Sequence, residues 1–138
     1  MKKTAAFITS LILSTSSIAA EWVELFNEGE FKILLDVGSV KDVPNNPYNY
    51  KKAWLKNIVV NDTTKDGLTV NDFVMTLVYV DCESLKYGFK AAYAYKNLKQ
   101  ISNETRAIPI MEDVIPETKA STIVDSVCYA YKKLNENQ

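Results

Sequence analysis

Two cysteines, Cys82 and Cys128, are the residues of this chain with the clearest chemistry. Their wide spacing excludes the CxxC arrangement of a redox pair. A bridge between them would close a loop of about 46 residues and stabilise a fold by roughly 3–4 kcal/mol on the chain-entropy estimate. The chain has no histidine, and two cysteines alone offer too few ligands for a metal. We therefore predict a structural disulfide between Cys82 and Cys128, formed in an oxidising compartment.

Acidic side chains are the next candidates for chemistry, and they fall mainly in turn-like stretches. Aspartate is frequent in turns because its carboxylate accepts hydrogen bonds from nearby backbone N–H groups. No histidine is present to activate a serine, and two paired cysteines leave no thiolate nucleophile. We predict that the chain is not an enzyme and that it holds no cofactor and no metal. The aspartates considered are Asp36, Asp42, Asp62, Asp66, Asp72 and Asp81.

Aromatic side chains alternate with small and basic ones along residues 85–96. An exposed aromatic sheet face suits protein recognition, because aromatic residues are enriched among the side chains that dominate binding. Two interpretations stay open: a protein-binding surface, or a face covered by a loop or by a second copy in a homodimer. Lysines around the strand fit either an acidic partner or a solvated edge. The candidate binding surface consists of Tyr87, Phe89, Lys90, Tyr93 and Tyr95.

The first twenty residues have the pattern of a secretory signal peptide. Lys2 and Lys3 precede an apolar run over Ala5–Leu13, and Ser17-Ile18-Ala19 fits a small-x-small cleavage site. We predict a cleaved leader over residues 1–20 and one exported domain over residues 21–138, periplasmic or at the cell surface. No cysteine stands directly after the leader to receive a lipid, so no lipid anchor is expected. Later apolar runs are shorter than the ~18 residues of a membrane span, and the net charge of −1 gives no reason to expect nucleic-acid binding.

The elements that must position these side chains are short strands followed by one helix. Apolar residues in both phases of 72–82 predict a central strand covered on both faces, and Trp54 shares a phase with Ile58 in the strand before it. From Pro116 to about Asn135 apolar residues recur at three-and-four spacing, which predicts a helix. The predicted fold is α+β: an antiparallel sheet of about six strands with the C-terminal helix packed on one face and tied to it by the disulfide. The predicted strands cover 22–26, 31–36, 51–60, 72–82, 85–96 and 104–111.

The order of these landmarks resembles the surface-adhesin protein E-like family of Gram-negative bacteria. The resemblance covers essentially the whole chain after the leader, and it rests on the order and spacing of short motifs. These motifs are Trp22-Val23-Glu24, Asp36-Val37-Gly38-Ser39-Val40, Trp54, Tyr79-Val80-Asp81-Cys82, the aromatic strand Tyr87 to Tyr95, Pro116 and Val127-Cys128.

This resemblance implies a six-stranded sheet with a disulfide-held helix, and an adhesin that binds host matrix proteins such as vitronectin and laminin. The chain departs from the family in two ways: it has no lipidation cysteine after the leader, and it has no histidine that could ligate haem. We predict a non-enzymatic exported protein-binding domain. The loops 43–50 and 61–71 are expected to contribute to its binding surface. The alternative is a periplasmic immunity or inhibitor protein that neutralises an antibacterial effector, and a carrier of a small apolar ligand between helix and sheet is a third class.

Overall fold

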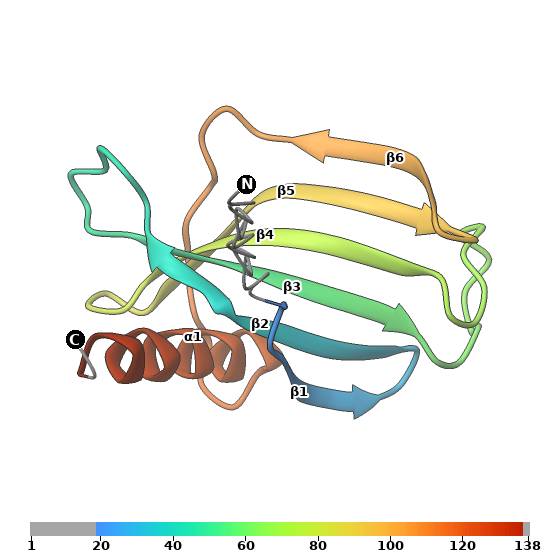
Figure 1. The fold of residues 1–138 in the computed structure, drawn as a ribbon, viewed down its shortest axis with the longest axis horizontal. Helices are drawn as coiled ribbons and strands as arrows, with labels where there is room; N and C mark the ends of the chain where they lie inside the picture. Colours follow the sequence, from blue (N-terminus) through green and yellow to red (C-terminus); the bar gives the residue numbers. More distant parts are fainter. Residues whose placement is uncertain (1–18, 137–138) are drawn as a thin grey trace, which may run out of the picture.

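A computed structural model describes residues 19–136 of the chain, in which six antiparallel strands form a meander (Figure 1). Each of the six strands pairs with its neighbour in sequence. The short strand β7 pairs with Lys86 and Tyr87 at the start of β5, on the same edge of β5 as β6. One helix, α1, follows. The predicted leader falls mostly on residues 1–18, outside the described residues. The elements are β1 (Trp22–Glu28), β2 (Phe31–Asp42), β3 (Lys51–Val59), β4 (Phe73–Asp81), β5 (Lys86–Lys96), β6 (Lys99–Thr105), β7 (Glu112–Asp113) and α1 (Lys119–Glu136).

The sixth strand is the main correction to the predicted strands, because it occupies Lys99–Thr105 and not 104–111. A two-residue turn, Asn97-Leu98, connects β5 to β6, and both turn residues have positive φ, 49° and 65°. Tight hairpins of this kind need two left-handed residues and usually use Asn-Gly. Leucine in the second position gives no such signal. The turn, and therefore the strand after it, could not be read from the residue types.

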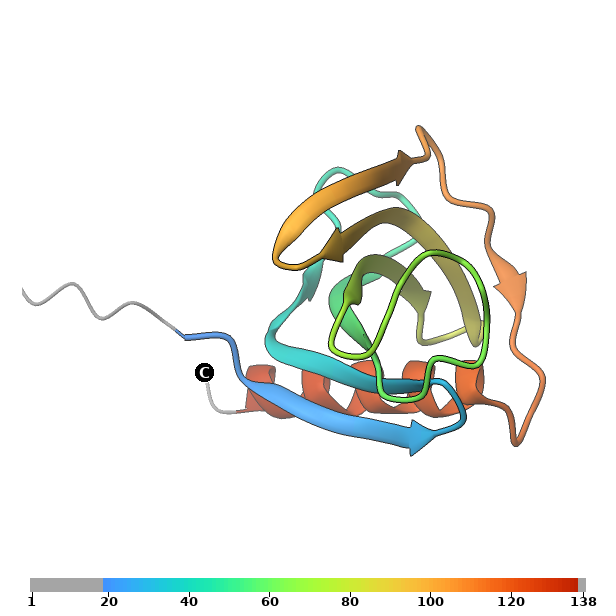
Figure 2. The same cartoon turned by 90° about the vertical axis from the view of Figure 1, so that its right-hand side faces the viewer.

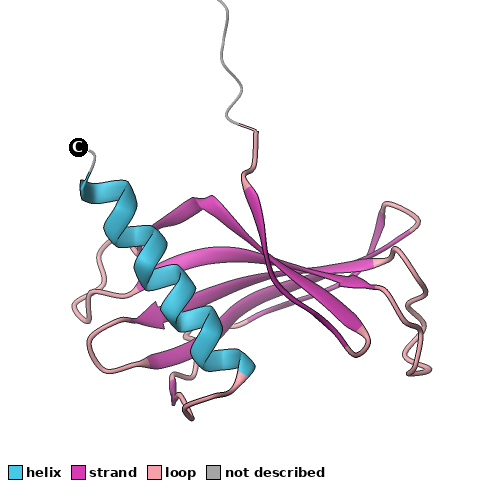
Figure 3. Cartoon of the chain, turned by 90° about the horizontal axis from the view of Figure 1, so that it is seen from below, coloured by secondary structure: helices cyan, strands magenta, loops and turns pink. Residues whose placement is uncertain are grey.

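The helix packs on one face of the sheet and crosses its strands obliquely (Figure 3). The segment 106–118 runs from the β6 edge of the sheet to the start of α1 (Figure 2). Between helix and sheet lies the core, in which each fully buried aliphatic side chain contributes about 1.5–3 kcal/mol. The predicted fold class, an antiparallel sheet of six strands with one C-terminal helix on it, is confirmed. The buried core residues are Leu35, Val40, Ala53, Leu55, Val78, Val80, Ile123, Val124, Val127 and Ala130.

The helix begins at Lys119, three residues after the predicted start at Pro116. Glu117 has a φ of 62°, which no helical residue adopts. Thr118 caps the helix: its Oγ1 accepts a hydrogen bond from the Ser121 N–H at 3.3 Å, and its own N–H donates to Ser121 Oγ at 3.1 Å. This pair of side-chain bonds satisfies groups that the first turn leaves open.

The predicted disulfide is confirmed between Cys82, directly after β4, and Cys128 in α1, with Cα atoms 5.8 Å apart. Cys82 and Cys128 both pack against the core cluster. The bridge therefore joins the last element of the chain to an interior strand of the sheet. A disulfide-bonded domain fits an exported protein.

A buried lysine ties the C-terminal half of α1 to the end of the sheet. Lys51 is 5% exposed, and its Nζ lies 2.6 Å from Asp42 Oδ1 and 4.2 Å from the centre of the Tyr131 ring. The Tyr131 hydroxyl donates to Asp42 Oδ2 at 3.0 Å. The hydrogen bond from Lys51 is the main cause that lowers the pKa of Asp42. Burial alone would lower the pKa of Lys51, but the contacts with Asp42 and Tyr131 outweigh it and raise that pKa.

The two faces of β3 and β4 differ in how far they are covered, whereas residues 72–82 were predicted to be covered on both faces. Ala53, Leu55 and Val59 form the buried side of β3, whereas Trp54 and Ile58 lie on the opposite side and are only half-buried. In β4, the phase of Val78 and Val80 packs under α1. The other phase of β4 is half-buried and faces away from the helix, so this central strand is not covered on both faces by elements of the described chain.

Candidate functional site

The predicted aromatic stripe is divided between the two faces of the sheet by a bulge in β5. Leu77 pairs with Ala91 and Val78 with Phe89, so Lys90 is one extra residue without a partner across β4. A bulge of this kind shifts the alternation of the strand by one position. Tyr87 and Phe89 therefore share a face with Val78 and Val80, and Tyr93 and Tyr95 lie on the opposite face. The single surface predicted from alternation is wrong.

The half of the stripe before the bulge is covered. Tyr87 packs against the core cluster, and burial raises the pKa of its hydroxyl. The guanidinium of Arg106 lies 4.2 Å from the centre of the Phe89 ring. Both aromatic side chains therefore have structural contacts within the chain.

Lys90, the bulge residue, is held by the segment that follows β6. Its Nζ donates hydrogen bonds to the carbonyl oxygens of Arg106 and Ala107. The Lys90 carbonyl accepts a hydrogen bond from the Arg106 N–H at 2.9 Å. Its ammonium group holds the path of the chain beyond β6, which gives Lys90 a structural role.

The half of the stripe after the bulge joins aromatic side chains from other strands on the face opposite α1. Tyr93 contacts Trp54 of β3, with ring centres 6.0 Å apart, and Tyr95 stacks on Phe73 of β4 at 4.8 Å. No helix covers this face within residues 19–136, because the one helix there packs on the other side (Figure 3). We call it the open face, and its central residues are Trp22, Asp36, Trp54, Phe73, Met75, Tyr93 and Tyr95.

A hollow of about 490 Å³ lies in the open face. Across the strands, Trp22 of β1 pairs with Asp36 of β2, and Asp36 pairs with Trp54 of β3. Asp36 therefore lies between Trp22 and Trp54 in one row of the sheet. Residues lining the hollow are Ala20, Trp22, Asp36, Trp54, Met75, Tyr93, Tyr95 and Gln100.

Three of the residues that line this hollow could be singled out from the sequence, but their proximity could not be predicted. Trp22, Asp36 and Trp54 stood out as landmarks of the chain, but no pattern along the sequence placed them together. Their juxtaposition depends on the register of two hairpins. The β1–β2 register depends on the turn at Gly29, whose φ is 69°, and on a bulge between Glu24 and Phe26. The β2–β3 register shifts once more between Asp36 and Lys41.

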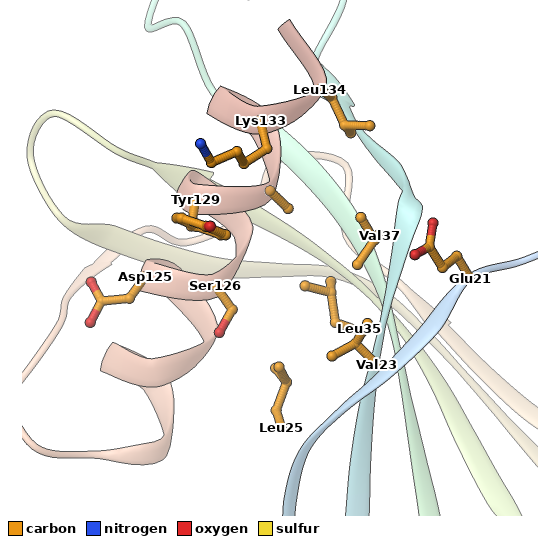
Figure 4. A pocket seen from close by; sticks show the side chains of 11 residues that line it. Glu21, Val23, Leu25, Leu35, Val37, Asp125, Ser126, Tyr129, Lys133 and Leu134 are labelled. Atoms are coloured by element: carbon orange, nitrogen blue, oxygen red, sulfur yellow. The ribbon is translucent and has the colours of Figure 1, made fainter. Parts of the chain in front are cut away.

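A second concavity, a groove of about 600 Å³, separates α1 from β1 and β2 (Figure 4). Leu35 and Val37 line it from β2, and Val23 and Leu25 line it from β1. Leu134 and Ser126 point toward the strands from the helix side (Figure 4). Most of the lining is aliphatic, so the groove can accept an apolar molecule. The remaining lining residues are Glu21, Asp125, Tyr129, Ala130 and Lys133.

The two loops expected to share a binding surface lie at opposite ends of the sheet. Residues 43–50 connect β2 to β3 at one end, and residues 61–71 belong to the β3–β4 connection at the other (Figure 1). Asp72 fixes the second connection by accepting hydrogen bonds from the N–H groups of Thr69 and Asn97. These hydrogen bonds lower the pKa of the Asp72 carboxyl, and the one from Thr69 is the larger cause. The two loops therefore do not lie side by side.

Neither a metal centre nor a membrane-crossing helix occurs in the described part of the chain. Over residues 19–136, no three histidine, cysteine, aspartate or glutamate side chains lie together in a way that could hold a metal ion. The helix α1 is not apolar enough to cross a membrane.

Comparison of the chain with protein-family models, curated proteins and solved structures gives no match. The resemblance to protein E-like adhesins therefore stays a hypothesis that rests on the order of sequence landmarks. The open face and the groove are the features of the described chain that bear on its function.

Proposed function

We propose that the chain is a non-enzymatic, exported protein-binding domain that contacts its partner through the open face. The observation that carries the proposal is the gathering of Trp22, Trp54, Tyr93 and Tyr95 on a sheet face that no helix of residues 19–136 covers. Tryptophan and tyrosine supply a large contact area at low conformational cost, and they are enriched among residues that dominate protein–protein binding.

The sheet under this face supports the proposal, because it holds the aromatic side chains in fixed positions. Trp54 and Tyr93 lie on interior strands, each hydrogen-bonded to neighbours on both sides. Ring contacts between Trp54 and Tyr93 and between Phe73 and Tyr95 restrict side-chain rotation before a partner arrives. A preorganised surface loses less conformational entropy on binding.

Two kinds of partner fit such a domain: a host matrix protein, as the resemblance to adhesins implies, or a periplasmic effector that the protein neutralises. The place of the protein in the cell separates them. Antibody labelling and protease digestion of intact cells would support the adhesin. Release only with the periplasmic fraction after osmotic shock would contradict the adhesin and favour the immunity or inhibitor protein.

Truncation of Trp54 is expected to weaken binding to the partner at least 30-fold, the effect of losing a hot-spot residue worth about 2 kcal/mol. The measurement is surface plasmon resonance of the purified protein on immobilised laminin and vitronectin, with Trp54→Ala compared with wild type. Tyr129→Ala is the matched control, because Tyr129 is an aromatic residue 65% exposed on α1, away from the open face. Binding that Tyr129→Ala weakens as much as Trp54→Ala would contradict the open face as the binding surface.

A second function, carriage of a small apolar ligand, is favoured by the groove between α1 and β1. Its volume of about 600 Å³ lies within the usual range of small-molecule sites, about 300–1,000 Å³. The fluorescent apolar probe N-phenyl-1-naphthylamine is expected to bind saturably, and Val23→Glu is expected to weaken it about tenfold by placing a carboxylate in the groove. Ile101→Glu, an exposed site on β6, is the control. Equal binding by both variants would exclude the groove.

A further inference from the structure

Asp36 is a carboxylate among the largely aromatic residues of the open face. Within residues 19–136 it is the only charged side chain that lines the hollow. Its Oδ1 atom is buried and receives no hydrogen bond from any described residue. A carboxylate withdrawn from water without a donor is unfavourable, and the penalty falls when a cation or a donor approaches.

Among residues 19–136, no ion pair reaches Asp36. Lys56, in the neighbouring row of the sheet, holds its Nζ 4.2 Å from the centre of the Phe73 ring. Asp36 therefore has no cationic partner in the described part of the chain.

We propose that the hollow receives a cationic side chain, arginine or lysine, from the protein partner. This inference rests on the proposed function and specifies the chemistry of the partner. The carboxylate of Asp36 supplies the opposite charge, and Trp22 and Trp54, its cross-strand neighbours, supply aromatic faces that attract a cation. A guanidinium group suits the site especially well, because it is planar, weakly hydrated and stacks on aromatic rings.

The amino terminus of the processed chain would be a competing cation. Ala20 lines the hollow, and removal of a leader that ends at Ala19 would create an α-ammonium group on Ala20. Such a group would be tethered close to Asp36 and would exclude a partner's side chain. The experiment must therefore distinguish a cation from outside from the amino terminus of the processed protein.

Intrinsic fluorescence reports on the hollow directly, because the chain has two tryptophans and both line it. The purified protein is titrated with N-acetylarginine amide and with N-acetylcitrulline amide, a neutral side chain of nearly the same shape. We expect a saturable fluorescence change with the arginine compound, at least tenfold weaker binding of the citrulline compound, and weakening of the arginine titration by salt. Equal binding of the two compounds would overturn the inference without any variant.

The variant Asp36→Asn is expected to weaken the arginine titration at least tenfold, whereas Asp113→Asn, which changes an exposed carboxylate on β7, leaves it unchanged. Unchanged binding by Asp36→Asn would overturn the inference. Arginine binding that appears only after acetylation of the protein's terminal amine would also overturn it, because the chain's own ammonium then fills the hollow. If Trp54→Ala weakens partner binding but Asp36→Asn does not, the open face stands as the binding surface and only the cation is wrong. If neither variant weakens it, both proposals fail.

Discussion

Replacement of both Cys82 and Cys128 by serine is expected to lower the melting temperature of the oxidised protein by about 15 °C. The bridge closes a loop with a sequence separation of 46, and the chain-entropy estimate for such a loop is about 4 kcal/mol. For a domain of this size, 1 kcal/mol corresponds to about 4 °C. The loop contains β5, β6, β7 and the start of α1, so the unfolded chain regains freedom over a third of its length.

The disulfide prediction is best tested by thermal unfolding followed by circular dichroism, with and without dithiothreitol. Reductant should bring the wild type down to the melting temperature of the double variant and leave the variant unchanged. The native far-ultraviolet spectrum should survive at 20 °C in both proteins. Buried Val124 and Val127 still hold α1 on the sheet, and so do the contacts of Tyr131 with Asp42 and Lys51. A double variant that melts within 3 °C of the oxidised wild type would show that the bridge adds no stability.

The parts of the fold that the sequence predicted are those with strong local patterns. The α1 stripe repeats over about five turns, and strands β2 to β5 carry enough β-branched and aromatic residues to be recognised. β6 was placed wrongly because its residues, KQISNET, are all exposed and give no apolar alternation. Its position follows from the turn at Asn97-Leu98, in which both residues have positive φ, and the two residue types together do not predict such a turn.

The candidate site could be predicted only in part, because alternation assumes an unbroken strand. One extra residue, Lys90, moves Tyr93 and Tyr95 to the face opposite Tyr87 and Phe89. The residue that causes the shift is stabilised by the carbonyl groups of Arg106 and Ala107, which lie far along the chain. The role of Asp36 was hidden for a similar reason, since its position between Trp22 and Trp54 is a matter of strand register.

Leu35 connects the stability of the core with the groove, and Leu35→Ala is expected to destabilise the protein by about 3 kcal/mol. The side chain is 1% exposed, pairs across the sheet with Val23 and Leu55, and also lines the groove. At about 4 °C per kcal/mol, the melting temperature should fall by about 12 °C. Leu98→Ala is the matched control, since Leu98 is 85% exposed at the β5–β6 turn and its truncation should change the melting temperature by less than about 2 °C.

The same variant tests whether the groove opens toward the core. Truncation of Leu35 enlarges the apolar space between α1 and β2, so an apolar ligand should bind the variant and stabilise its folded state. At a concentration of N-phenyl-1-naphthylamine one hundred times its Kd, binding would return about 2.7 kcal/mol, most of the loss caused by the truncation. A rise in melting temperature with the probe that is larger in Leu35→Ala than in the wild type would show that groove and core are continuous at this residue. An equal rise in the two proteins would show that the vacated space is sealed from the groove.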